Sequence, residues 1–247
     1  MIDFKNKSSG VDIGYFELLG MIDGHIIEPT KRNFDAMSER NGSRSYWLRH
    51  DVDDCIDLSW EMAKVESERG IHAAYFFLNT APYFRWSAFL DMARDFVNIG
   101  HTIGLHNNCV TAAYKHGDDA QADKMLSRDL GYLRKAGEVF ITASHGDIWN
   151  RHHDVMNYEM FSECKRRGVF PHKPMAHYGL SYEAYFTPKD FYLSDSGGVW
   201  STTRDINVSL SKEIPPGKSP MPVIDAFNES KSGIMQLLVH PQWWEVR

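Results

Sequence analysis

The sequence has few cysteines and no long apolar run, and each absence excludes a class of protein. Its three cysteines, Cys55, Cys109 and Cys164, are an odd number without the spacing of a zinc site. The longest markedly apolar run, 73–78, is far shorter than the roughly 20 residues of a membrane-spanning helix. The first residues, 1–7, lack the apolar core of a secretory signal. We therefore expect a reducing, cytoplasmic setting and no transmembrane segment.

Blocks of lysine and arginine are also missing, and the formal net charge is -6. A nucleic-acid-binding surface needs clustered positive charge, so we expect no nucleic acid as the main partner. Hydrophobic residues make up 43% of the 247, which is enough for a substantial core. This length fits one large α/β domain or two small ones. Because no long linker interrupts the chain, we expect a single domain over 1–247, with 1–44 as an N-terminal lead-in packed on it.

From residue 45 onward, strand-like and helix-like segments alternate along the chain. The expected strands are the short runs 45–48, 72–78, 102–105, 139–143, 191–193, 199–201 and 234–239. The expected helices are 56–69, 86–98, 118–136 and 155–167, with a further helical stretch near 13–21. This alternation favours a parallel sheet, and its length suits a closed barrel. An open doubly wound sheet is the alternative.

Histidine or aspartate residues follow five of these expected strands. They are His50, Asp51 and Asp53 after the first, then His106, His145 with Asp147, Asp195 and His240 after later strands. The carboxyl ends of parallel strands meet at one edge of the sheet, where α/β proteins assemble their sites. A lone histidine is most often a core or surface residue, but five such strand ends favour an active site.

Asp51 and Asp53 are two residues apart, so in an extended strand both side chains point to the same face. Two carboxylates on one face need a cation or a shared proton. This arrangement suits a metal ligand beside a general base. The alternative is a solvated acidic turn, with Asp54 as the N-cap of the next helix.

These motifs resemble those of the polysaccharide deacetylase family, the NodB-homology or carbohydrate esterase family 4 group. His50-Asp51-Val52-Asp53 resembles its first motif, in which the first aspartate is the base and the second binds metal. The segment 100–106 resembles the second motif, whose final histidine binds metal, so the resemblance implies this role for His106. The segment 237–241 resembles the last motif, which supplies the catalytic histidine, so the resemblance implies that role for His240. The resemblance implies an α/β fold that is an incomplete TIM-like (β/α) barrel.

The segments 51–53, 143–147 and 240–244 are most similar to the branch linked to bacterial surface-polysaccharide (O-antigen) gene clusters. Two positions depart from the family pattern. The second metal histidine is expected four residues after the first, where this chain has Val110, which has no ligand atom. The Arg-x-Pro-Tyr motif is replaced by the segment 142–146. We expect His145 to replace the missing ligand, because it follows its strand as His106 does. A weakly held or absent metal is the alternative.

The resemblance implies one divalent ion bound by Asp53 and His106, and we expect His145 to be the third ligand because of its place after a strand. Mixed nitrogen and oxygen ligation suits zinc first, and also nickel, cobalt or iron. Asp51 would accept a proton from the attacking water, and His240 would donate one to the departing nitrogen.

Asp195 and Trp243 are the candidate substrate-binding residues. Asp195 is expected to orient His240 or to bind a sugar hydroxyl, unless it is only a turn residue. Trp243 and Trp244 are expected to line a sugar-binding groove or to cover the edge of the barrel. His50 and His101 are expected to be structural, and the segment 151–153 to be a solvated loop end.

The expected function is metal-dependent de-N-acetylation of an N-acetylated sugar or glycan precursor in O-antigen biosynthesis. A deformylase or another amide hydrolase acting on a sugar is a related alternative. The alternative from another class is a non-catalytic relative that binds a glycan or a partner protein, having lost its metal with Val110. The sugar, its linkage and the oligomeric state do not follow from the sequence.

Overall fold

The structure is a computed structural model of the 247-residue chain. It describes residues 2–6, 13–37, 42–117, 121–146, 148–163, 173–202 and 219–246. Asp147, Cys164 and parts of the helices predicted over 118–136 and 155–167 lie outside the described residues. Among the described ranges, no helix is long and apolar enough to cross a membrane.

Seven parallel strands are hydrogen-bonded in the order β7-β6-β5-β4-β3-β9-β8. Their bounds are β3 Arg44–Val52, β4 Ala74–Leu78, β5 Thr102–Asn107, β6 Ile141–Ser144, β7 Tyr182–Glu183, β8 Phe191–Ser194 and β9 Gly233–Val239. Starting at β3, the neighbours on one side are β4, β5, β6 and β7, in chain order, and those on the other side are β9 and then β8. Among the described strands, β7 and β8 at the two ends of this order are not hydrogen-bonded to each other. That is the strand order of an incomplete (β/α) barrel, so the predicted fold class is confirmed.

Contacts within the chain divide it into two compact units. The first contains Met1–Asp51, Cys55–Ala74 and Pro188–Arg247, and the second contains Val52–Asp54 and Tyr75–Thr187. Each unit contains candidate site residues of its own, and each is treated by itself. The single domain expected from the sequence stays a prediction.

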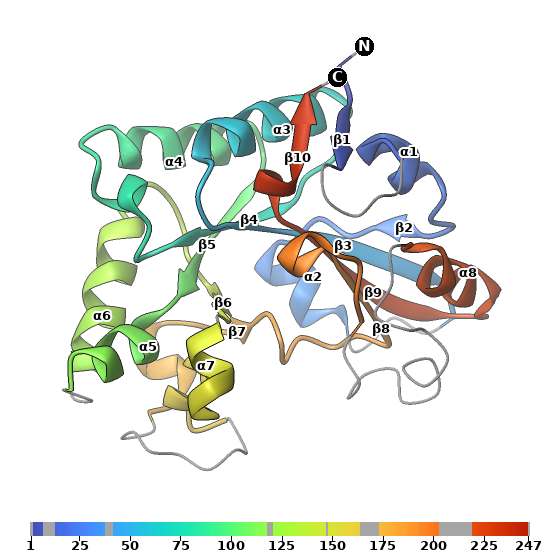
Figure 1. Cartoon of the computed structure of the whole chain (residues 1–247). Helices are drawn as coiled ribbons and strands as arrows, with labels where there is room; N and C mark the ends of the chain where they lie inside the picture. The colour runs from blue at the N-terminus through green and yellow to red at the C-terminus, as the bar shows by residue number, and fades with distance from the viewer. Residues whose placement is uncertain are drawn as a thin grey trace. The chain divides into compact units, whose positions relative to one another are not determined.

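The first unit is built on β3, β8 and β9, with the short strand β2 (His25–Ile26) parallel to β3. Eight of the nine residues of β3 are buried, as expected for a parallel strand covered on both faces. The helices of this unit are α1 (Tyr15–Gly20), α2 (Lys31–Asp35), α3 (Ile56–Glu68) and α8 (Met221–Glu229). The terminal strands β1 (Phe4–Asn6) and β10 (Trp244–Val246) lie side by side and antiparallel (Figure 1).

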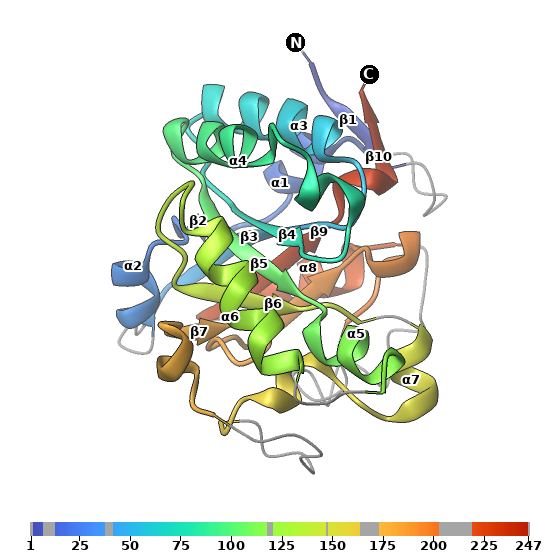
Figure 2. The same cartoon turned by 90° about the vertical axis from the view of Figure 1, so that its left-hand side faces the viewer.

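The second unit contains β4 to β7 and a cover of helices. These are α4 (Phe89–Asn98), α5 (Cys109–Lys115), α6 (Gln121–Leu133) and α7 (Ile148–His153), with 3-10 turns at Pro82–Arg85, Asn157–Met160 and Met175–Tyr178. Helices α4 and α6 both contact β5 (Figure 2). In α4 the buried residues Phe89, Ala93 and Phe96 recur at helical spacing and form one apolar face. Gly104 in β5 allows the ring of Phe76 to approach, since a Cβ there would lie 2.5 Å from it.

The local structure differs from the sequence predictions at several points. Strand β3 runs four residues beyond the predicted end, because Arg49, His50 and Asp51 find buried partners within the protein. The N-cap of α3 is Cys55, not Asp54. The predicted strand at 199–201 is only an isolated bridge between Ser194 and Ser201.

The helix predicted over 155–167 is wrong in its described part. Helix α7 lies earlier, over Ile148–His153, and Asp154 with a left-handed φ of 51° follows it. A 3-10 turn then begins at Asn157, whose side chain is used in long-range hydrogen bonds. The sequence analysis did not predict α2, α5, α8 or the short strands β1, β2, β7 and β10.

Candidate active site

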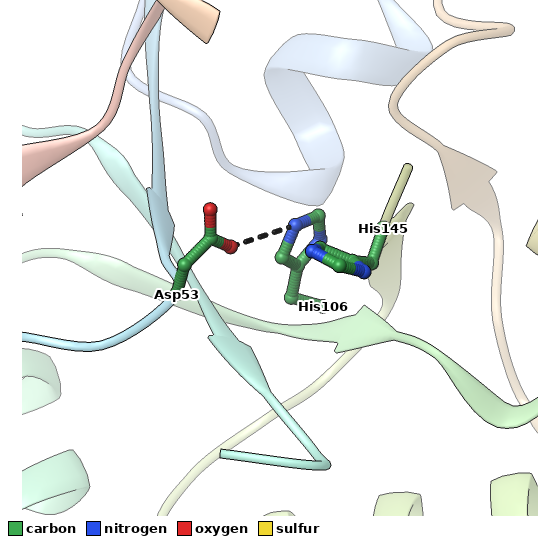
Figure 3. A group of neighbouring side chains, drawn as sticks. All are labelled: Asp53, His106 and His145. Atoms are coloured by element: carbon green, nitrogen blue, oxygen red, sulfur yellow. Dashed lines mark ion pairs between the residues drawn. The ribbon is translucent and has the colours of Figure 1, made fainter. Parts of the chain in front are cut away.

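The three predicted metal ligands come together in the second unit. Asp53 directly follows β3, His106 lies in β5, and His145 directly follows β6. One ligand atom of each residue lies within 4.8 Å of those of the other two. Figure 3 shows the three side chains gathered around a common point, with Asp53 Oδ1 3.2 Å from His106 Nε2. Three side chains from three strand ends thus form one potential metal site.

The register of β5 and β6 explains why the two histidines meet. The strands are parallel, with His106 opposite Ala143 and Asn107 opposite Ser144. The ladder continues one residue further, because the N–H of His145 donates to the Asn107 carbonyl at 2.9 Å. Since alternate residues share a face, His145 points the same way as Ala143 and therefore as His106. Their rings meet edge to face with centroids 5.1 Å apart.

The hydrogen bond at the far side of His106 determines which nitrogen can bind a metal. Nδ1 of His106 lies 2.9 Å from the carbonyl oxygen of Ala143. A carbonyl only accepts, so Nδ1 carries the hydrogen, and Nε2 of the neutral ring presents a lone pair toward Asp53. A lone pair and a carboxylate oxygen at this distance need either a proton or a cation between them.

The cluster therefore fits a divalent ion. Its donors are two imidazole nitrogens and one carboxylate oxygen, a set typical of zinc sites that keep a position open. The bond from His106 to a backbone carbonyl is the usual second interaction of a metal-binding histidine. Val110 is fully buried in the first turn of α5, so the position at which the family resemblance expects a second histidine belongs to the core.

A second cluster lies in the first unit and contains His240, Asp195 and Asp51. His240, directly after β9, donates from Nδ1 to Asp195 Oδ1 at 2.7 Å and from its backbone N–H at 2.9 Å. The indole N–H of Trp244 donates to the other oxygen of Asp195 at 2.8 Å. The remaining nitrogen of His240, Nε2, lies 3.9 Å from Asp51 Oδ2.

This arrangement bears on the two roles expected for Asp195, which both stay predictions. Its carboxylate is fully buried and accepts three N–H groups, all from His240 and Trp244. It has no exposed oxygen for a sugar hydroxyl, so the geometry favours orientation of His240 over substrate binding. Trp244 is also buried and cannot line a groove, whereas Trp243 is half-buried. The sugar contact of Trp243 stays a prediction.

Arg49 is a member of the second cluster that the sequence analysis missed. Its Nε and Nη2 donate to the two oxygens of Asp51 at 2.8 and 2.7 Å, and both side chains are buried. This bidentate pairing fixes the plane of the carboxylate. A carboxylate has about four lone-pair sites, and this pairing uses two of them. The signal was available, because Arg49 and Asp51 are two residues apart on one strand.

His50 and His101, which were expected to be structural, are both buried. His50 is fully buried, and its Nε2 lies 2.9 Å from Glu66 Oε1, which also accepts from the hydroxyl of Tyr15. Burial, together with the charge of Glu66, raises the pKa of Tyr15 well above its ordinary value. His101 is buried against Tyr75, with ring centroids 5.0 Å apart. His152 and His153, at the end of α7, are exposed.

No protein-family model matches the sequence, and a comparison with curated proteins finds no match. Solved structures similar to the chain include family 4 carbohydrate esterases. One, from Bacillus anthracis, has 18% identity over 46% of this chain and 57% of that chain, with a TM-score of 0.33. A CE4 esterase from Streptococcus mutans has 11% identity over 87% of this chain and 82% of that chain, with a TM-score of 0.48.

A pseudoenzyme of the CE4 family from Bacillus anthracis is also similar. It has 14% identity over 81% of this chain and 56% of that chain, with a TM-score of 0.38. These identities and TM-scores are too low for a function to be transferred.

Proposed function

We propose that the protein is a metal-dependent hydrolase that removes the acetyl group from an N-acetylated sugar. The observation that carries this proposal is the convergence of Asp53, His106 and His145 within 4.8 Å. We assign these three residues as the metal ligands, with zinc as the first candidate and nickel, cobalt or iron as alternatives. A divalent ion at such a site supplies a Lewis acid and lowers the pKa of a coordinated water.

Asp51 is the proposed general base. It is joined to the ligand Asp53 through a single residue, Val52, so their Cα atoms lie at most about 7 Å apart. Asp51 accepts a proton from the attacking water, while Arg49 holds its carboxylate in a fixed plane. A positioned base of this kind contributes about 10²- to 10⁴-fold to the rate.

His240 is the proposed general acid. When its ring is protonated, Nε2 carries the hydrogen that passes to the amide nitrogen as the C–N bond breaks. Asp195 accepts the Nδ1–H at 2.7 Å and stabilises the positive ring. The products are acetate and the free amine of the sugar. Water provides the added oxygen of acetate and one proton to Asp51, and return of that proton to His240 restores both residues. The second proton of the water leaves with acetic acid, which ionises to acetate.

We place the substrate among N-acetylated sugars or glycan precursors of bacterial surface polysaccharide, following the motif resemblance of 51–53, 143–147 and 240–244. Trp243 is the proposed sugar-contacting residue, because it is the half-buried member of the tryptophan pair. Val110 is the observation that favours the alternative, a non-catalytic glycan- or partner-binding protein.

An acetate-release assay tests the proposal. The protein is freed of metal with a chelator, reloaded with zinc, cobalt or nickel, and incubated with N-acetylated monosaccharides, nucleotide sugars and oligosaccharides. We expect acetate release that needs added metal and is lost in Asp51→Asn. Protein that takes up no metal and releases no acetate from the whole panel would instead support the binding protein.

A further inference from the structure

The buried side chain of Asn157 holds the segment that carries His145. Its Nδ2 donates to the carbonyl oxygen of His145 at 2.7 Å. The same amide nitrogen lies 3.0 Å from Thr111 Oγ1 and 3.1 Å from Asn108 Oδ1, and Oδ1 accepts the backbone N–H of Thr111 at 3.1 Å. Asn157 is fully buried, so these bonds are shielded from water. The shortest of them is the bond to His145.

The backbone of His145 is consequently held on both sides of its Cα. Its N–H donates to the Asn107 carbonyl at 2.9 Å, and its carbonyl accepts from Asn157. Fixing both peptide groups fixes the direction of the Cα–Cβ bond and hence the region that the imidazole can reach. The next residue, Gly146, is exposed and has no side chain that could anchor the segment.

The amide of Asn157 also links this segment to α5. Thr111, which bonds to both ends of the amide, lies in the first turn of α5 beside Val110. A histidine at position 110 would have its backbone held by the hydrogen bonds of α5. His145 belongs to neither a strand nor a helix. Its backbone is instead linked to the first turn of α5 through the side chain of Asn157.

We propose that Asn157 is a positioning residue of the metal site, which sets the place of His145 and thereby the affinity for the ion. This inference rests on the metal site of the proposed function and not on deacetylation. Residues that orient metal ligands typically change affinity by about 10- to 100-fold when they are lost. Replacement of Asn157 should weaken metal binding through His145 alone.

Asn150 provides a matched control for a merely structural effect. It is as buried as Asn157 and belongs to the same network, with Nδ2 2.7 Å from Thr111 Oγ1 and 2.8 Å from the Val155 carbonyl. These two hydrogen bonds of the Asn150 side chain go to Thr111 and Val155 and not to His145. Truncation to alanine removes the same atoms at both positions, so their effects on folding should be similar.

The test measures the dissociation constant of Zn²⁺ by competition with a chromophoric chelator, after thermal melts have shown cooperative unfolding. We expect Asn157→Ala to raise the dissociation constant by about 10- to 100-fold, and Asn150→Ala to leave it within about threefold of wild type. In a His145→Ala background, Asn157→Ala should add almost nothing to the loss. Asn157→Ser, which keeps a polar atom in the site, replaces the alanine variant if that variant does not fold.

Equal losses with and without His145, or equal losses in the two asparagine variants, would overturn the inference. So would unchanged affinity in both Asn157 variants while the wild-type protein binds zinc, and the proposed metal site would then remain intact. A wild-type protein that binds no metal would overturn the proposed function and this inference together.

Discussion

Asp195 accepts a 2.7 Å hydrogen bond from Nδ1 of His240, and the opposite nitrogen of the same ring lies 3.9 Å from Asp51. The buried carboxylate thus determines both the direction of the ring and which nitrogen is available for proton transfer. It also accepts the backbone N–H of His240 and the indole N–H of Trp244, so it is held rigidly.

Asp195→Asn should therefore lower kcat by about 10²-fold or more while zinc affinity stays unchanged. A neutral amide stabilises the protonated ring less, so the alkaline limb of the pH–rate profile should move to lower pH. Trp244→Phe, which removes one bond to Asp195 but keeps a ring, is the control and should cost much less. A pH–rate profile that does not move in Asp195→Asn would leave Asp195 without the proposed role.

Asp51 and Asp53 should separate cleanly in their effects on metal and turnover. Carboxylates bound to a cation lose basicity, so the better base is the one kept off the metal. Asp51→Asn should keep the ion and lose about 10²-fold or more in kcat, whereas Asp53→Asn should lose ion and activity together. Elemental analysis alongside acetate release measures both. The roles are reversed if Asp51→Asn loses the metal and Asp53→Asn keeps it.

His145 should behave as a ligand in spite of its unusual place in the chain. His145→Ala should weaken zinc binding by more than about 10-fold, because a lost ligand exceeds the usual effect of an orienting residue. His153→Ala is a suitable control, since His153 is exposed at the end of α7 and stacks on Trp149. Zinc competition measures both variants, and unchanged affinity in His145→Ala would assign that residue to another task.

Arg49 should matter for stability as well as for the base. Arg49→Met leaves the buried carboxylate of Asp51 without its bidentate partner, which typically costs about 3–5 kcal/mol. In an Asp51→Asn background the same replacement should cost much less, because no buried charge is left behind. Urea unfolding of the four proteins of this cycle measures the difference. Equal costs in both backgrounds would show that the pair is not coupled.

Asp123 in α6 should give the fold a pH dependence at acidic pH. Hydrogen bonds from Lys173 and Tyr178 hold its pKa below the ordinary value. Because folding lowers this pKa, the ionised carboxylate stabilises the folded protein at a pH above the unfolded pKa of about 4. This stabilisation is lost as the pH falls through the folded pKa. The ion pair of Asp123 with Lys173 is partly exposed, so its loss should cost about 1 kcal/mol of unfolding free energy. Asp123→Asn should therefore lower the Tm by about 2–4 °C at pH 7. The difference should shrink as the pH falls below the unfolded value of about 4, and a constant difference would contradict this.

The sequence indicated the parts of the fold and site that depend on local pattern. The apolar runs that became β3 and β9 and the helix α3 were recognisable, and so was the placement of Asp53, His106 and His145 at strand ends. Their common edge follows from parallel topology, which alternation of strands and helices predicts. The roles of these three residues stay predictions.

The parts that the sequence did not indicate depend on partners distant in the chain. Asn157 bonds to Thr111, which is 46 residues away in the chain. The sequence predicts a helix around Asn157, because the local pattern does not indicate hydrogen bonds to such a distant residue. Glu66 meets His50 from α3, and no local pattern marks that pair. Arg49 is the exception, since its spacing from Asp51 placed both on one face.

A metal map from anomalous scattering tests the central claim most directly. Crystals of protein reloaded with zinc are measured on both sides of the zinc absorption edge. The account predicts one ion per chain, about 2.0–2.2 Å from an oxygen of Asp53, Nε2 of His106 and a ring nitrogen of His145. An anomalous map without a peak at these three side chains, in protein exposed to saturating zinc, would contradict it.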